Sequence, residues 1–224
     1  MSTFVLIHGA GDVGWSWHLV VRALRDLGHD AVAPDLPCDD DRTGLNQYAD
    51  AVIDAIGNRR RLVVVGQSFG GFTVPLIAAR LPVDLLVFVT AMIPRPGEAP
   101  KDYWKNTRYK EAIRRASSDG VTGNDDPDVV FYHDVPRKLA EEAKRRARPQ
   151  SSAHDHEPWP LEAWPEVAAR AIVCTDDRFF PPAYARRVVT TRLGIVPDEI
   201  AAGHCVTLSR PRELAAMLHG YVNH

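Results

Sequence analysis

Short runs of β-branched and aliphatic residues alternate along the chain with longer stretches in which apolar positions recur at helical spacing. The runs predict strands, and the spaced stretches predict helices between them. The expected strands cover residues 3–7, 31–33, 61–65, 85–90, 171–175 and 199–201. The expected helices cover residues 17–27, 46–56, 69–81, 182–191 and 211–221. This alternation indicates an α/β fold with a mostly parallel central sheet, right-handed crossovers and helices on both faces.

The pattern breaks between residues 95 and 165. This segment is rich in proline, charged and aromatic residues, and only residues 137–146 carry a helical pattern in it. Insertions in an α/β sheet normally lie over the carboxyl ends of the strands, where ligands bind. We therefore expect a core of residues 1–94 and 166–224 and a lid of residues 95–165, in which Trp104 and Tyr132 are candidate substrate contacts.

The composition fits one domain with a small-molecule ligand. Of 224 residues, 45% are hydrophobic and 25% are charged, which is enough for one sizeable core. The formal net charge is −2, so neither nucleic acid nor an anionic membrane surface is expected as a partner. No apolar run approaches the roughly 20 residues that a spanning helix needs. The sequence carries no indication of an oligomeric state.

The chain start and the cysteines point to a reducing compartment. The opening sequence MSTFVLIHGA has no Lys or Arg before its apolar run, unlike a secretory signal. Cys38, Cys174 and Cys205 are odd in number and widely spaced, which argues against a disulfide framework and a zinc cluster. We expect a cytoplasmic protein.

A glycine-serine motif follows the buried run RLVVV. The sequence GQSFG at residues 66–70 stands between an expected strand and an expected helix, the context of the G-x-S-x-G nucleophile elbow. The glycines are needed because side chains at 66 and 70 would collide with the neighbouring strand or helix. Free N–H groups at the start of the helix favour developing negative charge. Ser68 is therefore the candidate nucleophile.

A serine hydroxyl becomes nucleophilic when a histidine takes its proton and a carboxylate orients that histidine. After a nucleophile elbow, the acid comes next along the chain, and the histidine follows it. The strand expected at 171–175 runs into Asp176 and Asp177, and His204 follows the last short strand. Asp177 is the favoured acid because a loop to a proline at a helix start follows it, while Asp176 is the alternative, which would instead cap the turn.

The stretch IHGAGDVGW at residues 7–15 is open to two interpretations. Its three glycines have the G-x-G-x-x-G spacing of a dinucleotide-binding loop, and Asp35 stands about where a ribose-binding acid would lie. Trp15 and Trp17 count against this interpretation, because a dinucleotide loop requires close helix packing after the third glycine. A nucleotide loop also leaves the serine elbow and His204 unexplained.

The same loop suits an oxyanion hole. A tetrahedral oxyanion needs two N–H donors about 2.7–3.1 Å from the forming charge. One comes from the residue after the nucleophile, Phe69, and the other from the loop after an early strand, where Ala10 stands between two glycines. We expect the backbone N–H groups of Ala10 and Phe69 to bind the oxyanion.

With these residues assembled, the chain resembles the α/β-hydrolase superfamily, and within it the branch of plant methylesterases and hydroxynitrile lyases and their bacterial esterase relatives. The matching stretches are VLIHGAGDVGWSW at 5–17, GHDAVAPDLP at 28–37, VVVGQSFGG at 63–71, VCTDDRFFPP at 173–182 and AGHCVTLSRP at 202–211. The resemblance implies a parallel sheet with a helical lid, an oxyanion hole at Ala10 and Phe69, and Asp177 as the acid.

Two departures from that branch bear on the reaction. The plant lyases carry a lysine after the catalytic histidine, where Cys205 stands here, and a threonine after the loop histidine, where Gly9 stands. Both departures disfavour cyanohydrin cleavage. The sequence therefore predicts a serine hydrolase that cleaves a small, largely apolar carboxylic ester or lactone through an acyl-enzyme, with no metal or organic cofactor.

Other functions stay open as alternatives. A hydrolase fold can carry out a non-hydrolytic step, such as a lyase or biosynthetic reaction, or serve as a ligand receptor. An NAD-binding oxidoreductase, based on the glycine loop at 9–14, is the less favoured alternative.

Overall fold

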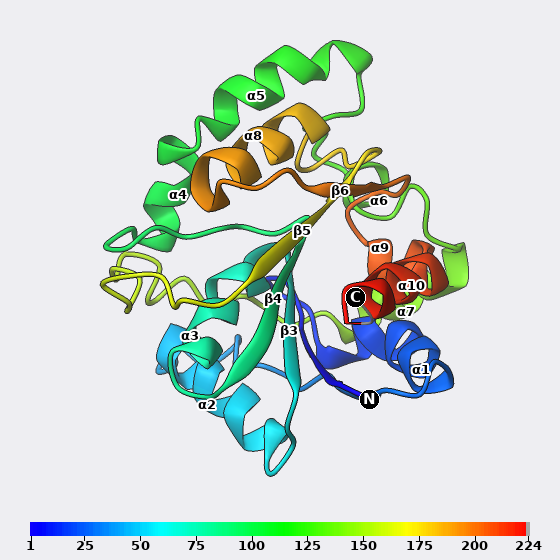
Figure 1. Ribbon diagram of the computed structural model, residues 1–224. Coiled ribbons are helices and arrows are strands. Elements are labelled where there is room, and N and C mark those ends of the chain that lie inside the picture. Colours follow the sequence, from blue (N-terminus) through cyan, green and yellow to red (C-terminus); the bar gives the residue numbers. More distant parts are fainter. Residues whose placement is uncertain (223–224) are drawn as a thin grey trace.

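In the computed structural model, which describes residues 1–222, six parallel strands form one sheet in the order β2-β1-β3-β4-β5-β6 (Figure 1). The strands are β1 (Thr3–Ile7), β2 (Asp30–Val32), β3 (Leu62–Gln67), β4 (Val83–Val89), β5 (Ala169–Cys174) and β6 (Asp198–Ile200). Each was expected within about three residues of its place, and the parallel α/β sheet is confirmed.

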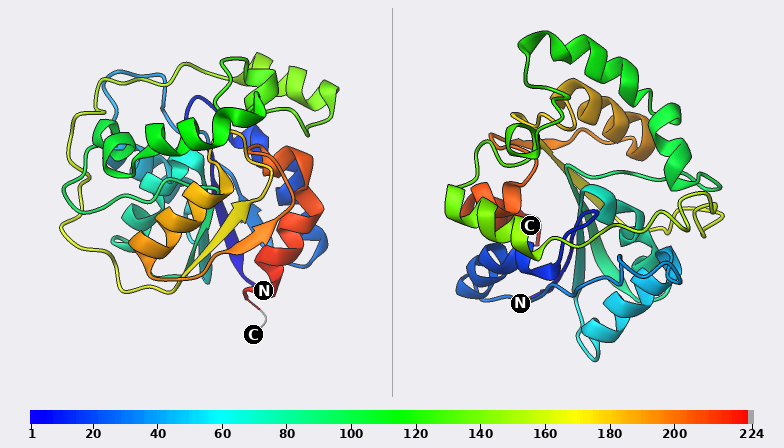
Figure 2. Two further views of the ribbon diagram at one scale, coloured as in Figure 1. Left: turned by 90° about the horizontal axis from the view of Figure 1, so that it is seen from above. Right: turned by 180° about the vertical axis from the view of Figure 1, so that it is seen from behind.

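Helices cover both faces of the sheet. Outside the 95–165 segment they are α1 (His18–Asp26), α2 (Leu45–Ile56), α3 (Val74–Ala78), α8 (Pro182–Leu193), α9 (Val206–Ser209) and α10 (Pro211–Gly220). Short 3₁₀ helices, η1 (Gly14–Trp17) and η2 (Ser68–Phe72), follow β1 and β3. The helices α1 and α10 lie on one face, and α2 and α3 lie on the other (Figures 1 and 2).

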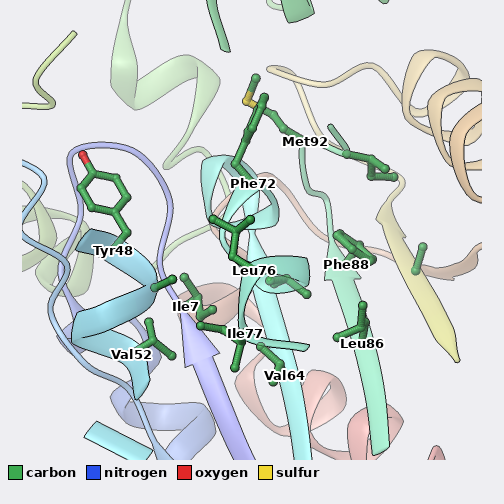
Figure 3. Packing of buried hydrophobic residues seen from close by; sticks show 14 of the residues in the cluster. Ile7, Tyr48, Val52, Val64, Phe72, Leu76, Ile77, Leu86, Phe88 and Met92 are labelled. Atoms are coloured by element: carbon green, nitrogen blue, oxygen red, sulfur yellow. The ribbon is translucent and has the colours of Figure 1, made fainter. Parts of the chain in front are cut away.

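The central strands are apolar on both faces because both are covered by helices. On one face, α2, α3 and α8 pack against a cluster that includes Ile7, Val64 and Phe88 (Figure 3). On the other, α1, α9 and α10 pack against a cluster that includes Leu6 and Val65. Two cores thus fix the sheet, and the loops at the carboxyl ends of its strands start from rigid positions.

The 95–165 segment holds more helix than its sequence predicts. Its elements are α4 (Pro100–Asn106), α5 (Tyr109–Ala116), the 3₁₀ helix η3 (Ser117–Asp119), α6 (Pro127–Val130) and α7 (Arg137–Arg146). The helix predicted at 137–146 is confirmed as α7, and the other helices of the segment were not predicted individually. The helix α5 is short and none of its residues is fully buried, so its apolar positions 109, 112, 113 and 116 carry little weight against the charged residues between them.

Three parts of the segment pack on the rest of the chain. The helix α5 contacts α8, as Figure 2 also shows, while α7 packs on α9 and η1 through Ala140, Leu208 and Trp15. The indole N–H of Trp159 donates to the carbonyl oxygen of Phe72 at 2.9 Å, near the end of the segment. Across residues 1–222, no helix is long and apolar enough to cross a membrane.

A buried ion pair joins the 95–165 segment to α8. The side chains of Glu98 and Arg192 are each 3% exposed, and Arg192 Nη2 lies 2.7 Å from Glu98 Oε1. Asn106 Nδ2 also donates to Glu98, at 2.9 Å, and the guanidinium of Arg192 lies 4.8 Å from the centre of the Tyr103 ring. The two charges therefore depend on each other for solvation.

A histidine pair near the amino terminus predicts a pH-dependent stability. His29 Nδ1 accepts the N–H of Ser2 at 3.2 Å, so its proton is on Nε2, 2.8 Å from His219 Nδ1. Burial lowers the pKa of His29, and His219 and the amino terminus lower that pKa further. Below about pH 6.5 the unfolded chain takes up a proton that the folded chain resists, so the free energy of unfolding falls as the pH decreases.

Thermal unfolding followed by circular dichroism between about pH 7.5 and about pH 5 checks this. The melting temperature of the wild type is expected to fall more steeply than that of His29→Gln, which keeps an acceptor for Ser2 but does not titrate. Parallel curves for the two proteins would show that this pair does not contribute.

Candidate active site

Ser68 follows β3 directly, on a turn that only glycine neighbours allow. Its backbone is in the left-handed region, with φ of 51°, which is strained for a residue with a side chain. A Cβ on Gly66 would lie 2.4 Å from Val74 Cγ2, and one on Gly70 would lie 2.7 Å from the carbonyl oxygen of His8. The glycines of the G-x-S-x-G motif are therefore required by close approach of neighbouring elements.

The helix expected at 69–81 is divided for a related reason. A Cβ on Gly71 would lie 1.9 Å from the carbonyl oxygen of Met92, and the N–H of Met92 donates to the carbonyl oxygen of Ser68 at 2.9 Å. The turn after β3 is thus pressed against the loop after β4. It adopts a tight 3₁₀ form as η2 before α3 begins at Val74.

The imidazole of His204 is bonded to the carboxylate of Asp177. The distance from His204 Nδ1 to Asp177 Oδ2 is 2.8 Å, and both side chains are buried. Asp177 Oδ1 accepts the N–H groups of Phe179 and Phe180 at 2.8 and 2.9 Å, and the Thr90 hydroxyl donates to Oδ2 at 2.5 Å. These donors solvate the carboxylate, which holds the proton of His204 on Nδ1 and leaves Nε2 free to accept one.

The structure brings Asp177 to His204 and uses Asp176 elsewhere. The backbone N–H of Asp176 donates to the carbonyl oxygen of Ala202 at 3.0 Å. This bond joins the loops that follow β5 and β6. Of the two acids left open by the sequence, Asp177 has the geometry of a histidine partner.

Three phenyl rings surround the imidazole of His204. The ring centres of Phe131, Phe179 and Phe180 lie 5.4, 5.0 and 5.2 Å from its centre, each in an edge-to-face arrangement. Such rings fix the orientation of the imidazole and restrict water around it. No role was predicted for these rings, although Phe179 and Phe180 lie two and three residues after Asp177.

The loop that carries Ala10 is held by His8. His8 Nε2 accepts the N–H of Leu36 at 3.0 Å, so Nδ1 carries the proton and donates to the carbonyl oxygen of Gly9 at 2.8 Å. Burial lowers the pKa of His8, which favours this neutral form. A Cβ on Gly9 would lie 2.7 Å from Gln67 Oε1, so the loop is packed closely against the end of β3.

The features that suggested a dinucleotide loop have other roles in the structure. Asp35 Oδ1 accepts the N–H of Gly14 at 2.7 Å. A Cβ on Gly14 would lie 2.1 Å from the carbonyl oxygen of Ala33, so this glycine allows β2 to approach. Gly11 has φ of 68°, and its N–H donates to Gln150 Oε1 at 3.2 Å. Bonds within the chain thus account for Asp35 and for two of the three glycines.

Ser68, His204 and Ala10 line one cavity of about 380 Å³. Tyr132 also lines it, whereas Trp104 lines a neighbouring hollow. The remaining lining residues are Gly9, Gly11, Asp12, Gln67, Pro127, Phe131, Lys144, Ala147, Phe179 and Cys205. The ring of Phe69 packs on Phe72, 5.2 Å between centres, and the candidate oxyanion donor is the backbone N–H of Phe69. At the second position of η2, its N–H has no carbonyl partner within the helix.

Comparison with known proteins bears on these features. Residues 4–217 match the model of a family described as "Alpha/beta hydrolase family". The chain belongs to the alpha/beta hydrolase family. Esterase PIR7B of Oryza sativa subsp. japonica is 30% identical over 250 residues, covering 96% of this chain and 93% of that protein. Methylesterase 3 of Arabidopsis thaliana is 27% identical over 249 residues, with the same coverage of both.

A solved structure supports the same fold. The crystal structure of polyneuridine aldehyde esterase superposes with a TM-score of 0.81 at 22% identity, covering 100% of both chains. The resemblance to plant methylesterases and their relatives is thereby confirmed, and the chain is an esterase-type α/β-hydrolase.

In this hydrolase, Cys205 is a neutral side chain beside the imidazole. Burial raises the pKa of the Cys205 thiol well above its ordinary value, and Asp12 and Asp177 raise that pKa further. A protonated thiol is a poor nucleophile. Within residues 1–222, no group of three or more His, Cys, Asp or Glu side chains is arranged to hold a metal ion.

Two adjacent residues of the 95–165 segment hold the loops that follow β5 and β6. His133 Nε2 lies 3.1 Å from the carbonyl oxygen of Asp176, and Asp134 Oδ2 accepts the N–H of Gly203 at 2.8 Å. A Cβ on Gly203 would lie 2.6 Å from Asp134 Oδ1. We call His133 and Asp134 the clasp, because each holds the backbone one residue before the bonded carboxylate or imidazole.

Proposed function

We propose that the protein hydrolyses small, largely apolar carboxylic esters or lactones with Ser68, His204 and Asp177 as its catalytic residues. The observation that carries this is the bond between His204 and Asp177, at a cavity that Ser68 also lines. The three groups come from the ends of β3, β5 and β6 in the order that an α/β-hydrolase requires.

In this mechanism Ser68 Oγ attacks the carbonyl carbon while His204 Nε2 takes its proton. The backbone N–H groups of Ala10 and Phe69 stabilise the oxyanion, and His204 then gives the proton to the leaving alcohol. Asp177 keeps the imidazole in its tautomer and stabilises its charged form. Water, activated by His204, hydrolyses the acyl-enzyme and restores Ser68.

The cavity supports a small and largely apolar substrate. Its volume of about 380 Å³ lies at the low end of the range for small-molecule sites. The phenyl rings of Phe131 and Phe179 form part of its wall beside His204. We infer that residues 95–165 act as a lid over a core of residues 1–94 and 166–224, since the segment supplies Phe131 and Tyr132 to this wall.

Turnover and covalent labelling test the proposal together. The protein is expected to hydrolyse p-nitrophenyl acetate and butyrate, and a fluorophosphonate probe is expected to add to Ser68, located by peptide mass spectrometry. Labelling without ester turnover would favour a non-hydrolytic reaction of the same serine. If the protein neither labels nor hydrolyses, a receptor role replaces the proposal.

The clasp predicts a positioning effect on this reaction. Asp134→Ala removes the acceptor for Gly203 N–H, so the loop that carries His204 shifts, and a shift of about 1 Å can lower kcat up to about 100-fold. We expect a fall of about tenfold or more in kcat for p-nitrophenyl butyrate with little change in KM. Asp134→Asn, which keeps an oxygen acceptor, is expected to recover most of the loss.

Asp125→Ala is the matched control, because Asp125 is exposed in the same segment. A lower melting temperature for Asp134→Ala with unchanged kcat would show that the clasp stabilises the fold without positioning the histidine.

A further inference from the structure

A second hollow lies next to the cavity that Ser68 lines. It measures about 790 Å³ and is formed by α4, α5 and the loop after β5. Three aromatic side chains form its floor: the ring centre of Trp104 lies 4.9 Å from that of Tyr109 and 6.1 Å from that of Phe179. This floor offers flat apolar surface to a ring-shaped ligand.

Phe179 belongs to both the hollow and the cavity. Its ring lies 5.0 Å from the imidazole of His204 on one side and 5.7 Å from the ring of Tyr109 on the other. Its backbone N–H donates to Asp177, which fixes its position. A single ring therefore lines both spaces, which are adjacent at Phe179.

The rim of the hollow is strongly basic. It is formed by Lys101, Lys105, Arg108, Lys110 and Arg114, against one acidic side chain, Glu111. Within residues 1–222, none of these five cations lies within 4 Å of a carboxylate. The whole chain has a net charge of −2, so this local excess of positive charge does not follow from the composition. Such a patch attracts anions and raises their local concentration.

We propose that the enzyme acts on aryl esters that carry a carboxylate remote from the scissile bond. The ester group lies in the cavity beside Ser68, the aromatic body packs on Trp104 and Tyr109 past Phe179, and the carboxylate lies among the cations of the rim. This inference rests on the proposed function and adds a substrate class to it. Dissolved salt screens the attraction between exposed cations and the carboxylate, so the preference for the carboxylate is strongest at low salt.

A matched pair of esters tests the charge requirement. 4′-Acetoxybiphenyl-4-carboxylate carries the anion, and the corresponding carboxamide is nearly isosteric and neutral. At about 20 mM salt the carboxylate is expected to have a kcat/KM about tenfold higher than the amide, and at about 0.5 M salt the two values are expected to converge.

Charge variants locate the effect. The triple variant Lys101→Gln, Lys105→Gln and Lys110→Gln is expected to remove the preference for the carboxylate, because it lowers kcat/KM for the carboxylate about tenfold more than for the amide. The matched control, Arg22→Gln, Arg60→Gln and Arg212→Gln, removes three exposed cations from other elements and is expected to keep the preference.

Binding to Ser68→Ala provides a readout that does not need turnover. Calorimetry is expected to show tighter binding of biphenyl-4-carboxylate than of its amide, and the lysine variant is expected to lose this difference. Equal kcat/KM values and equal binding of the two compounds would overturn the inference, while hydrolysis of the neutral ester would leave the proposed function intact. Absence of hydrolysis with carboxylate binding retained would overturn the proposed function alone.

Discussion

Ser68→Ala is expected to lower kcat for p-nitrophenyl butyrate by about 10⁴- to 10⁶-fold. The variant removes the atom that we propose forms the acyl-enzyme, while the strained turn, the proposed oxyanion donors and the bonded imidazole stay in place. Steady-state assays with p-nitrophenyl butyrate measure the loss of activity. The loss should appear in kcat, with KM changed little. Covalent labelling by the fluorophosphonate should disappear at the same time.

Ser117→Ala is the control for this experiment, because Ser117 is exposed and its hydroxyl bonds only to a carbonyl oxygen of α5. The double variant Ser68→Ala and His204→Ala should be no slower than Ser68→Ala alone, since residues that act as a unit lose activity together. Residual activity within tenfold of the wild type in Ser68→Ala would rule out this serine as the nucleophile.

Arg192→Met is expected to lower the free energy of unfolding by about 3–5 kcal/mol. The change leaves the carboxylate of Glu98 buried at 3% exposure with only Asn106 as a polar side-chain donor. It also removes the guanidinium that lies over the Tyr103 ring. Urea or guanidinium chloride unfolding followed by circular dichroism measures the loss.

Two further variants separate the buried charge from general effects of the substitution. Arg137→Met breaks an exposed ion pair with Glu141 and should leave the unfolding midpoint unchanged. The double variant Glu98→Met and Arg192→Met removes both charges and should be more stable than Arg192→Met alone. A single variant as stable as the wild type would mean that water reaches Glu98 when its partner is absent.

The sheet could be predicted from the sequence because its strands are buried on both faces. Runs such as those in β3 and β4 are apolar at nearly every position, and this signal does not depend on distant residues. The helices α4 and α5 gave no comparable signal. The helix α5 has eight residues, none of them buried, and half of its sequence YKEAIRRA is charged, so contact with α8 decides that it lies there.

The candidate site divides in the same way. Ser68, Asp177 and His204 could be named as candidates from the sequence because each follows a strand within a recognisable motif. Thr90 and Asp134 were not found, because they reach their partners across 87 and 69 residues and belong to no motif. Thr90 does follow a strand next to β5, and this place at the carboxyl edge of the sheet was the available signal.

The path of the 95–165 segment could not be predicted from sequence patterns. The sequence proposed Tyr132 and Trp104 as substrate contacts on their aromatic character alone. The structure places Tyr132 in the cavity with Ser68 and Trp104 in the next hollow, behind Phe179. Which aromatic residues face which space depends on how α4 to α7 cross the sheet edge, and that is fixed by tertiary contacts.

The clasp limits how this protein can diverge. The bonded groups belong to loops that the sheet holds, whereas Phe131 and Tyr132 line the cavity from the 95–165 segment, which contributes no strand to the sheet. Mutations in that segment can therefore exchange one selectivity for another during evolution and leave the reacting atoms untouched. His133 and Asp134 are the exception, so a chimera that receives this segment from a relative needs equivalents of both to retain its turnover.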